Sequence, residues 1–422
     1  MIYIGPASFL KGTIDLPGSK SYSIRAFLIA ACGGTSLIKN PSDCDDARVA
    51  MNVANFLGTH FIESRNTIWK SASVSNAVPF KMIKVKESGT VLRFLLPLLA
   101  LKRQPIIITG EGTLKGRPNH FLLETLRQRG VHIKGKGAKE SIPIYLQGGQ
   151  FKAGRITIDG SLSSQFISAL LIACPQLEDN THLTLKGEKI VSSDYITMTL
   201  QVLKKAGVVV YQKTAREFFI KGRQKFNGFK NFNVPSDYGL AAFLLAGAAL
   251  IKSEVTLKGH LKDDLVQADG AILSFLKTMG VRFIKTSRLI KIKGPFQLRG
   301  GTFSLKDCPD LVPIMTILAL FAKGKTRLID IEHARVKESD RITDLRGELL
   351  KVGAHISETS NSLVITPQAQ YKGSCLLDPH HDHRLAMAFA ILGLKIGVYV
   401  KDIQCTAKSY PKFMKDLKSL IC

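Results

Sequence analysis

LKKAGVVV at residues 203–210 joins a helix-like stretch to a strand-like one through a single glycine. Four other segments share this pattern: NFLGTHFI (55–62), LRQRGVHI (126–133), LKTMGVRF (276–283) and LKVGAHI (350–356). The glycines are spaced 72, 77, 73 and 73 residues apart: Gly58, Gly130, Gly207, Gly280 and Gly353. Glycine at such a place adopts the left-handed conformation that ends a helix and turns the chain into a strand. This regular spacing predicts a repeated α/β (α+β) unit.

The period implies six units, since a chain of 422 residues holds nearly six periods. The sixth would end in KFMKDLKSLIC (412–422), which has the pattern of a last helix. Six units in a chain of this length favour two domains of three units each. The apolar segments Gly239–Ile251 and Leu311–Ala322 are shorter than the ~18 residues of a membrane span, so we expect buried helices.

Two places in the sequence favour a crossing between domains. The opening strand ends at Pro17–Gly18, and near Val234–Asp237 a polar stretch gives way to the apolar LAAFLLAGAALI. We therefore expect one discontinuous domain of residues 1–17 and 236–422, and a second domain of residues 18–235.

The formal net charge of +26 is the most unusual feature of the composition. It is compatible with nucleic acid, an anionic membrane surface or acidic small substrates. The densest basic runs, KGKGAK and KFNGFK, lack an aromatic recognition pattern, so charge alone does not choose among these ligands. Seven cysteines without a CxxC pair, and no apolar leader after Met1, predict reduced thiols and a cytoplasmic location.

Four segments of the first half place small polar or cationic residues at the start of an apolar helix. They are LPGSKSYSIR (16–25), SGTVLR (88–93), GEGTLKGRP (110–118) and SLSSQ (161–165). A helix N-terminus offers free N–H groups and a positive dipole end to an anion. Each segment alone is equally typical of an ordinary capped helix, but the four together favour recognition of a polyanion.

The second half adds carboxylates to the same kind of pattern. Its segments are CPDLVP (308–313), HARVKESDR (333–341), DHR (382–384) and CTAKSYP (405–411). VKESDR by itself is typical of an exposed, ion-paired helix start. The histidines around Asp382 could suggest a metal site, but no remote fourth ligand is evident, so we expect no metal.

In this order, the motifs PGSKS-x-S-x-R, SGTxxRF, GxGxxxxRP, GSxSSQF, PD, RVKESDR, DHRxAM and CxxKSYP resemble the 5-enolpyruvylshikimate-3-phosphate synthase family. The resemblance runs from residue 16 to residue 411 and therefore covers nearly the whole chain. It implies two domains, each built from three βαβαββ units, with the active site in the cleft between them. It also implies transfer of the enolpyruvyl group of phosphoenolpyruvate to shikimate 3-phosphate in the shikimate pathway.

The resemblance assigns roles residue by residue. It implies catalytic roles for Asp310, Glu338 and Lys20. It implies contact with the two substrates for Lys20, Ser21, Arg25, Gly89, Arg93, Arg117, Ser163, Ser164, Gln165, Ser192, Tyr195, Asp310, His333, Lys337, Arg341, His383, Arg384 and Lys408. No cofactor, nucleic acid or membrane is implied, and we expect a monomer.

The charges of these residues fit the implied chemistry. The two substrates carry roughly six negative charges, from two carboxylates and two phosphates. Eight of the assigned side chains are cationic. Proton transfer needs one group to accept the hydroxyl proton and another to serve the methylene carbon. We expect Asp310 in the first role and Glu338 in the second, assisted by Lys20.

Some positions depart from the family pattern. Glu87 and His333 stand where the family usually has Asn, and PSDYGLAAF (235–243) replaces its Gly-Asp-x-Ser-Ser turn. An acid at position 87 suits a phosphate site only if it points away or pairs with a cation. Two alternatives remain: the related UDP-N-acetylglucosamine enolpyruvyl transferase, whose opening motif differs, and a basic nucleic-acid-binding protein.

Overall fold

The computed structural model describes residues 1–63, 68–73 and 82–422, which divide into two compact units. Unit 1 comprises Met1–Gly18, Asp43–Asp45 and Pro235–Cys422, and unit 2 comprises Ser19–Ser42 and Asp46–Val234. The chain therefore passes between the units near Gly18 and again near Val234. No helix within the described part is long and apolar enough to cross a membrane.

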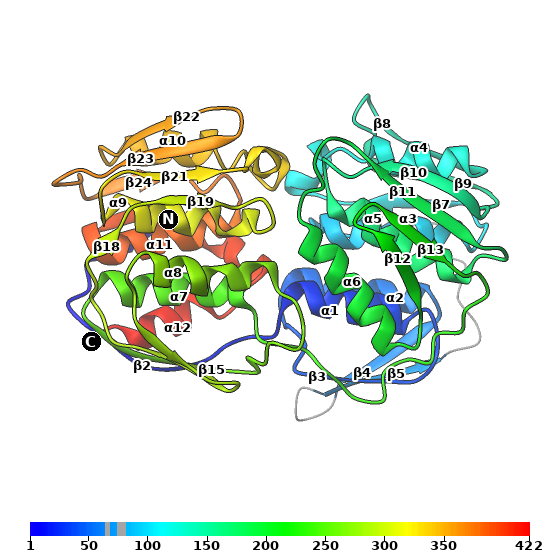
Figure 1. The fold of residues 1–422 in the computed structure, drawn as a ribbon, viewed down its shortest axis with the longest axis horizontal. Coiled ribbons are helices and arrows are strands. Elements are labelled where there is room, and N and C mark those ends of the chain that lie inside the picture. Colours follow the sequence, from blue (N-terminus) through cyan, green and yellow to red (C-terminus); the bar gives the residue numbers. More distant parts are fainter. Residues whose placement is uncertain (64–67, 74–81) are drawn as a thin grey trace. The chain divides into compact units, whose positions relative to one another are not determined.

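Unit 2 contains three four-stranded sheets, each completed by two helices (Figure 1). Taken in the order of neighbouring strands, each sheet has two parallel strands, then a strand antiparallel to the second, then an edge strand antiparallel to the third. The strands are β6 (Met82–Lys84), β7 (Ile106–Thr109), β9 (Ser141–Gly149) and β8 (Val131–Lys136); β10 (Gly154–Asp159), β11 (Thr181–Lys186), β13 (Glu217–Ile220) and β12 (Val210–Thr214); and β14 (Phe232–Asn233), β3 (Ser36–Lys39), β5 (Ile68–Ser73) and β4 (Thr59–Glu63). The helices are α1 (Lys20–Ala30), α2 (Asp45–Phe56), α3 (Gly89–Ala100), α4 (His120–Gln128), α5 (Ser164–Ala173) and α6 (Ser193–Lys205).

Unit 1 repeats this strand order twice and a shortened form once. Its strands are β2 (Leu10–Asp15), β15 (Ser253–Lys258), β17 (Leu289–Ile292) and β16 (Phe283–Lys285); β19 (Thr302–Ser304), β21 (Thr326–Ile329), β23 (Ser362–Thr366) and β22 (His355–Glu358); β24 (Cys375–Leu377), β25 (Val398–Val400) and β1 (Ile2–Ile4); and the pair β18 (Leu298–Arg299) and β20 (Ala322–Lys323). The helices are α7 (Tyr238–Leu250), α8 (Ala271–Thr278), α9 (Val312–Leu320), α10 (Thr343–Leu350), α11 (His383–Ile396) and α12 (Phe413–Leu420).

The six predicted repeats are confirmed, and three of them are completed by distant parts of the chain. In one of these, β2 near the N-terminus pairs with β15. Strand β14 pairs with β3 although almost two hundred residues separate them, and β1 at the N-terminus pairs with β25 near the C-terminus. The five repeat glycines all have left-handed backbones, with φ of +91°, +89°, +83°, +95° and +81° in chain order. Each glycine follows a helix and precedes an edge strand of its repeat, namely β4, β8, β12, β16 or β22. The glycine pattern therefore located the turns from helix to strand correctly.

Each of the two compact units is built around three buried helices. In unit 1, α7 and α9 are buried at every position, and both contact α11. Figure 1 shows these three helices between the β2–β15 edge and the β21–β23 edge of the unit. In unit 2, α3 packs against α1 and α5. The apolar helices predicted near residues 239–251 and 311–322 are therefore confirmed as core helices.

Candidate active site

Many of the predicted site residues of unit 2 lie at or near the N-terminal ends of its three buried helices, and Ser192 precedes α6 in the same way. Helix α1 begins at Lys20, α3 at Gly89 and α5 at Ser164. The Oγ of Ser163 caps α5 by accepting a hydrogen bond from the backbone N–H of Gln165 at 3.3 Å. These ends carry partial positive charge, so the fold itself favours an anion there before any side chain is counted.

Lys20 meets an acidic partner that the sequence did not indicate. Its ammonium donates to Asp46 on α2 at 3.1 Å, and the two side chains are only 13% and 7% exposed. Because the pair is largely shielded from water, Asp46 holds Lys20 at the start of α1 more firmly than a surface partner would. Asp46 lies within a plain helical pattern, and nothing in the sequence distinguished it from a solvated acid.

Arg25 is a buried link between α1 and α6. It donates to the hydroxyl of Thr199 at 2.8 Å and to the backbone oxygens of Ser21 and Tyr195 at 3.0 and 3.1 Å. Burial lowers the pKa of Arg25 to about 10, so the guanidinium remains charged at neutral pH. These contacts bring two predicted binding residues, Ser21 and Tyr195, to the same cation.

Arg93 joins α3 to α5 in the same way. Its guanidinium donates to the side-chain oxygen of Gln165 at 2.6 Å and to the backbone oxygen of Pro118 at 3.0 Å. The amide of Gln165 in turn donates to the hydroxyl of Thr90 at 3.0 Å. The network holds the Gln165 amide in one orientation, and Thr90 belongs to it although it was not among the predicted site residues.

Gly89 leaves room for Arg117 at the start of α3. A Cβ at Gly89 would lie 3.0 Å from Cζ of Arg117 and 2.7 Å from its Nη1, and the second distance is shorter than real Cβ contacts. Arg117 is 6% exposed. The glycine of the SGT motif is thus explained by the close approach of a guanidinium and not by its own backbone conformation.

Two of the three departures from the family pattern, Glu87 and His333, have physical explanations. Glu87 accepts a hydrogen bond from the hydroxyl of Thr113 at 3.3 Å and lies against Gly112, so its carboxylate is held by the neighbouring turn. His333 is 7% exposed, and burial together with the charge of Lys337 lowers the pKa of its imidazole to about 3. His333 is therefore neutral at physiological pH, as the Asn it replaces would be.

Ser192 adopts a left-handed backbone immediately before α6, with φ of +54°. Such a conformation is uncommon outside glycine and costs about 1 kcal/mol or more. Strain of this kind concentrates at functional sites. Its position next to a helix start agrees with the binding role that the resemblance implied for Ser192.

In unit 1, Arg341 is the hub of a carboxylate cluster. It donates to Asp310 at 2.6 Å, to Glu338 at 3.0 Å, and to both oxygens of Asp382 at 2.7 and 3.2 Å. Arg341 is 1% exposed, so the VKESDR segment is not the solvated helix start that its charges alone would suggest. The predicted catalytic carboxylates, Asp310 and Glu338, thus share one guanidinium.

Arg384, at the start of α11, is the second cation of this cluster. It donates to Asp310 at 3.1 Å and to the backbone oxygen of Gly239 at 2.7 Å. The ammonium of Lys408 lies 3.8 Å from Glu338, and Nδ1 of His383 lies 2.6 Å from the hydroxyl of Ser409. Each of these predicted site residues therefore lies in or beside the same cluster.

Asp310 is held in its ionised form. Burial would raise the pKa of this carboxyl, but the positive charges of Arg384, Arg341 and Lys337 outweigh burial and hold the pKa well below its usual range. A carboxylate in this state is available to accept a proton. Its affinity for that proton depends on how strongly the two guanidiniums are engaged elsewhere.

Three possible metal ligands, from Glu338, Asp382 and His383, lie within 4.8 Å of one another. Two of them already accept hydrogen bonds from Arg341, whose charge would repel a cation. The donor set therefore suits a guanidinium better than a metal ion.

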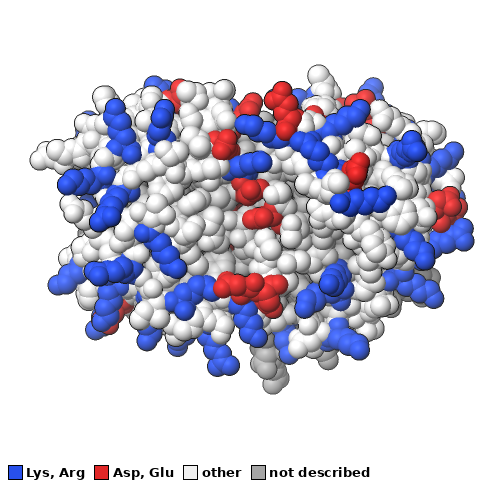
Figure 2. Space-filling view, in the orientation of Figure 1, with Lys and Arg blue, Asp and Glu red and all other residues white. Residues whose placement is uncertain are grey.

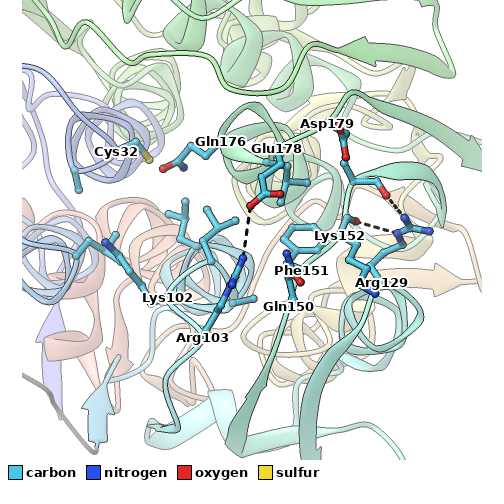
Figure 3. A pocket seen from close by; sticks show the side chains of 17 residues that line it. Cys32, Lys102, Arg103, Arg129, Gln150, Phe151, Lys152, Gln176, Glu178 and Asp179 are labelled. Carbon is cyan, nitrogen blue, oxygen red and sulfur yellow. Dashed lines mark hydrogen bonds and ion pairs between the residues drawn. The ribbon is translucent and has the colours of Figure 1, made fainter.

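Unit 2 contains a cavity of about 580 Å³ (Figure 3). It is lined from the C-terminal ends of α1, α3 and α5, opposite to the helix ends that carry predicted site residues of unit 2. Its lining mixes bases with acids, and Figure 3 shows Arg103 directed toward Glu178, 3.8 Å away. Burial raises the pKa of Cys32 to about 12, so this thiol remains protonated. Helix C-termini carry partial negative charge, so the cavity lacks the uniformly positive surroundings found at the helix starts.

Lys and Arg side chains are scattered over the visible face and do not gather into one basic patch (Figure 2). This distribution differs from the continuous basic surface typical of proteins that track a nucleic-acid backbone.

Comparisons with known proteins point to one family. A family model described as EPSP synthase (3-phosphoshikimate 1-carboxyvinyltransferase) matches residues 4–417. Curated proteins named 3-phosphoshikimate 1-carboxyvinyltransferase are 34% identical in Methanosarcina acetivorans (98% of this chain, 96% of the relative) and 35% identical in Sulfurovum (99% of each).

Solved structures agree with the sequence relatives. The EPSP synthase of Acinetobacter baumannii is 26% identical, covers 99% of this chain and 97% of its own, and has a TM-score of 0.79. The enolpyruvyl transferase NikO of Streptomyces tendae shares the fold with a TM-score of 0.79 at 17% identity, covering 99% of this chain and 96% of its own. Because both the family model and relatives above 30% identity span nearly the whole chain, it belongs to the EPSP synthase (3-phosphoshikimate 1-carboxyvinyltransferase) family.

Proposed function

We propose that this protein transfers the enolpyruvyl group of phosphoenolpyruvate to the 5-hydroxyl of shikimate 3-phosphate and releases phosphate. The reaction is an addition followed by an elimination. The hydroxyl oxygen bonds to the central carbon of phosphoenolpyruvate while the methylene carbon gains a proton. Loss of that proton and of phosphate then restores the double bond.

The observation that carries this proposal is the sharing of Arg341 by two carboxylates, Asp310 at 2.6 Å and Glu338 at 3.0 Å. The reaction needs two proton-transfer groups, and this cluster contains two carboxylates among cations that suit anionic substrates. We assign the hydroxyl proton to Asp310 and the protons at the methylene carbon to Glu338, assisted by Lys20.

Substrate binding would itself prepare Asp310 for its role. Arg384 and Arg341 now stabilise the ionised form of Asp310. When the carboxylate and phosphate of phosphoenolpyruvate engage these guanidiniums, part of their charge is neutralised, and the pKa of Asp310 rises toward a value suited to a base. The base therefore becomes stronger when its substrate is present.

We propose that both units contribute to one substrate site in the cleft between residues 18–235 and the discontinuous domain of residues 1–17 and 236–422. Shikimate 3-phosphate would be held by Lys20, Ser21, Arg25, Ser163, Ser164, Gln165, Ser192, Tyr195, His333 and Lys337. Phosphoenolpyruvate would be held by Lys20, Gly89, Arg93, Arg117, Arg341, His383, Arg384 and Lys408. The protein would act in the cytoplasm as a monomer, without metal or cofactor.

Phosphate release tests the reaction. With both substrates, wild-type protein should release phosphate, while Asp310→Ala and Glu338→Ala should each lose about a hundredfold or more in turnover, the scale of general acid–base catalysis. Both variants should still bind shikimate 3-phosphate in a calorimeter. Glu332→Ala, at an exposed position near Glu338, is the control and should retain wild-type turnover.

The identity of the acceptor distinguishes this reaction from that of the related UDP-N-acetylglucosamine enolpyruvyl transferase. Release of phosphate with UDP-N-acetylglucosamine, and none with shikimate 3-phosphate, would replace the proposed function with that of the related transferase. Full turnover by both carboxylate variants would refute the assigned proton-transfer roles while leaving the reaction in place.

A further inference from the structure

Asp269 is a buried carboxyl beside the proposed site that no motif indicated. It lies in the short helix η3 (Ala268–Gly270) and is 6% exposed. Its Oδ2 is 3.8 Å from Nη2 of Arg384. Its Oδ1 has no hydrogen-bond partner among the residues that the structure describes. A buried polar atom without a partner is rare in folded proteins and calls for a physical explanation.

The packing around Asp269 is built for a close approach to Arg384. A Cβ at Gly239 would lie 2.2 Å from Oδ2 of Asp269 and 2.8 Å from Nη1 of Arg384. Only glycine at this first turn of α7 leaves space for both groups. Nη2 of Arg384 is therefore shared by two carboxyls, Asp310 at 3.1 Å and Asp269 at 3.8 Å.

The charges facing Asp269 come from every element around it. They are Asp310 in η4 (Pro309–Leu311), Asp237 at the N-cap of α7, Arg384 on α11 and Arg341. Burial and, after it, the negative charge of Asp310 raise the pKa of Asp269 to about 7, against the opposing effect of Arg384. Asp269 thus changes charge in the neutral range, while its neighbour Asp310 stays ionised.

We propose that Asp269 is a positioning residue: its protonated form leaves Arg384 available to an anionic substrate, and its ionised form draws the guanidinium away. This inference rests on the proposed role of Arg384 in binding phosphoenolpyruvate. A second negative charge beside Arg384 also repels the incoming anion directly. Both effects weaken binding as the pH rises through neutrality, and neither requires Asp269 to touch the reacting atoms.

Calorimetric binding of phosphoenolpyruvate, measured from about pH 6 to about pH 9, tests the proposal independently of turnover. In wild-type protein we expect the Kd to rise about tenfold across neutrality, within the usual range for coupled sites. Asp269→Asn keeps the shape of the side chain and cannot ionise, so its Kd for phosphoenolpyruvate should change less than twofold over the same pH range. Asp264→Asn is the matched control, because Asp264 is exposed on the same segment, and it should retain the wild-type rise.

A wild-type rise that persists in Asp269→Asn would overturn the proposal, as would a wild-type Kd that does not change with pH. If Asp269→Asn does not fold, Asp269→Ser replaces it. Wild-type protein alone also answers the question through proton uptake. At about pH 7.5 the phosphate of phosphoenolpyruvate is already ionised, so binding should draw a proton onto Asp269. Calorimetry in two buffers of different ionisation enthalpy measures that proton uptake. Its absence would overturn the proposal.

Phosphate release in the same samples separates the two hypotheses. Loss of the pH dependence in Asp269→Asn would support this inference even if wild-type protein released no phosphate, and only the proposed reaction would then fail.

Discussion

Replacing Asp382 by Ala removes the buried partner that anchors Arg341. The two side chains are 0% and 1% exposed, and two hydrogen bonds of 2.7 and 3.2 Å join them. Removing one member of a buried ion pair costs about 3–5 kcal/mol. Arg341 keeps Asp310 and Glu338 as partners, so we expect the lower end of this range, about 3 kcal/mol. Asp382 also caps α11 by accepting from the backbone N–H of Arg384 at 2.8 Å, and loss of a cap costs about 1 kcal/mol more.

The sum, about 4 kcal/mol, is a large fraction of the 5–15 kcal/mol that stabilises a typical domain. Asp382→Asn should lose less, about 2 kcal/mol, since its amide oxygen can still accept one charged hydrogen bond. Urea unfolding followed by circular dichroism measures the total change. Hydrogen exchange of the α11 amides places the change in unit 1.

Glu254→Gln is the matched control, because Glu254 and Lys293 form a 2.8 Å ion pair between exposed side chains. Its urea midpoint should not change measurably, since solvent screens such a pair. The reasoning fails if Asp382→Ala loses less than about 1 kcal/mol, or if the exposed and buried pairs respond alike.

Three further predictions follow from individual contacts. Gly89→Ala should raise the KM for phosphoenolpyruvate without lowering the melting temperature, because the new Cβ would displace Arg117, whereas Gly116→Ala, which meets nothing within 4 Å, should leave that KM unchanged. Thr199→Val should cost about 2 kcal/mol in urea unfolding, because Arg25 loses a buried acceptor at 2.8 Å, while half-buried Thr197→Val should not. Because the pKa of Asp310 is depressed in the folded protein, its stabilising contribution is present above about pH 4 and is lost as the pH falls below it. Unfolding of Asp310→Asn in acid should therefore depend less steeply on pH than that of wild type, and equal slopes would contradict the assignment.

Much of the site could be predicted because its residues come in short, ordered motifs at helix starts. Lys20, Gly89 and Ser163 were each placed before an apolar run, and in the structure each lies at the N-terminal end of a buried helix. The chemistry of a helix start is local: it depends on a cap, a break in the strand and a few polar residues. Such features are visible in a sequence.

The partners of those residues could not be predicted in the same way. Thr199 is 174 residues from Arg25, and Asp269 lies in VQADG, which carries no motif. Asp46 sits in an ordinary helical stretch. Each becomes significant only because folding brings it beside a cation in a poorly solvated place, and the sequence does not encode that distance in any local pattern.

The repeat of five glycines was enough to establish the units, their number and the class of fold, because the left-handed turn after a helix is a property of one residue and its neighbours. The electrostatic state of the site is a different kind of property. Asp310 and Asp269 are both aspartates before a helix, yet one pKa is driven below its ordinary value and the other is raised to about 7. Burial acts on both, and the difference lies in how closely Arg384 and Arg341 approach each carboxyl, which is set by packing among segments far apart in the chain.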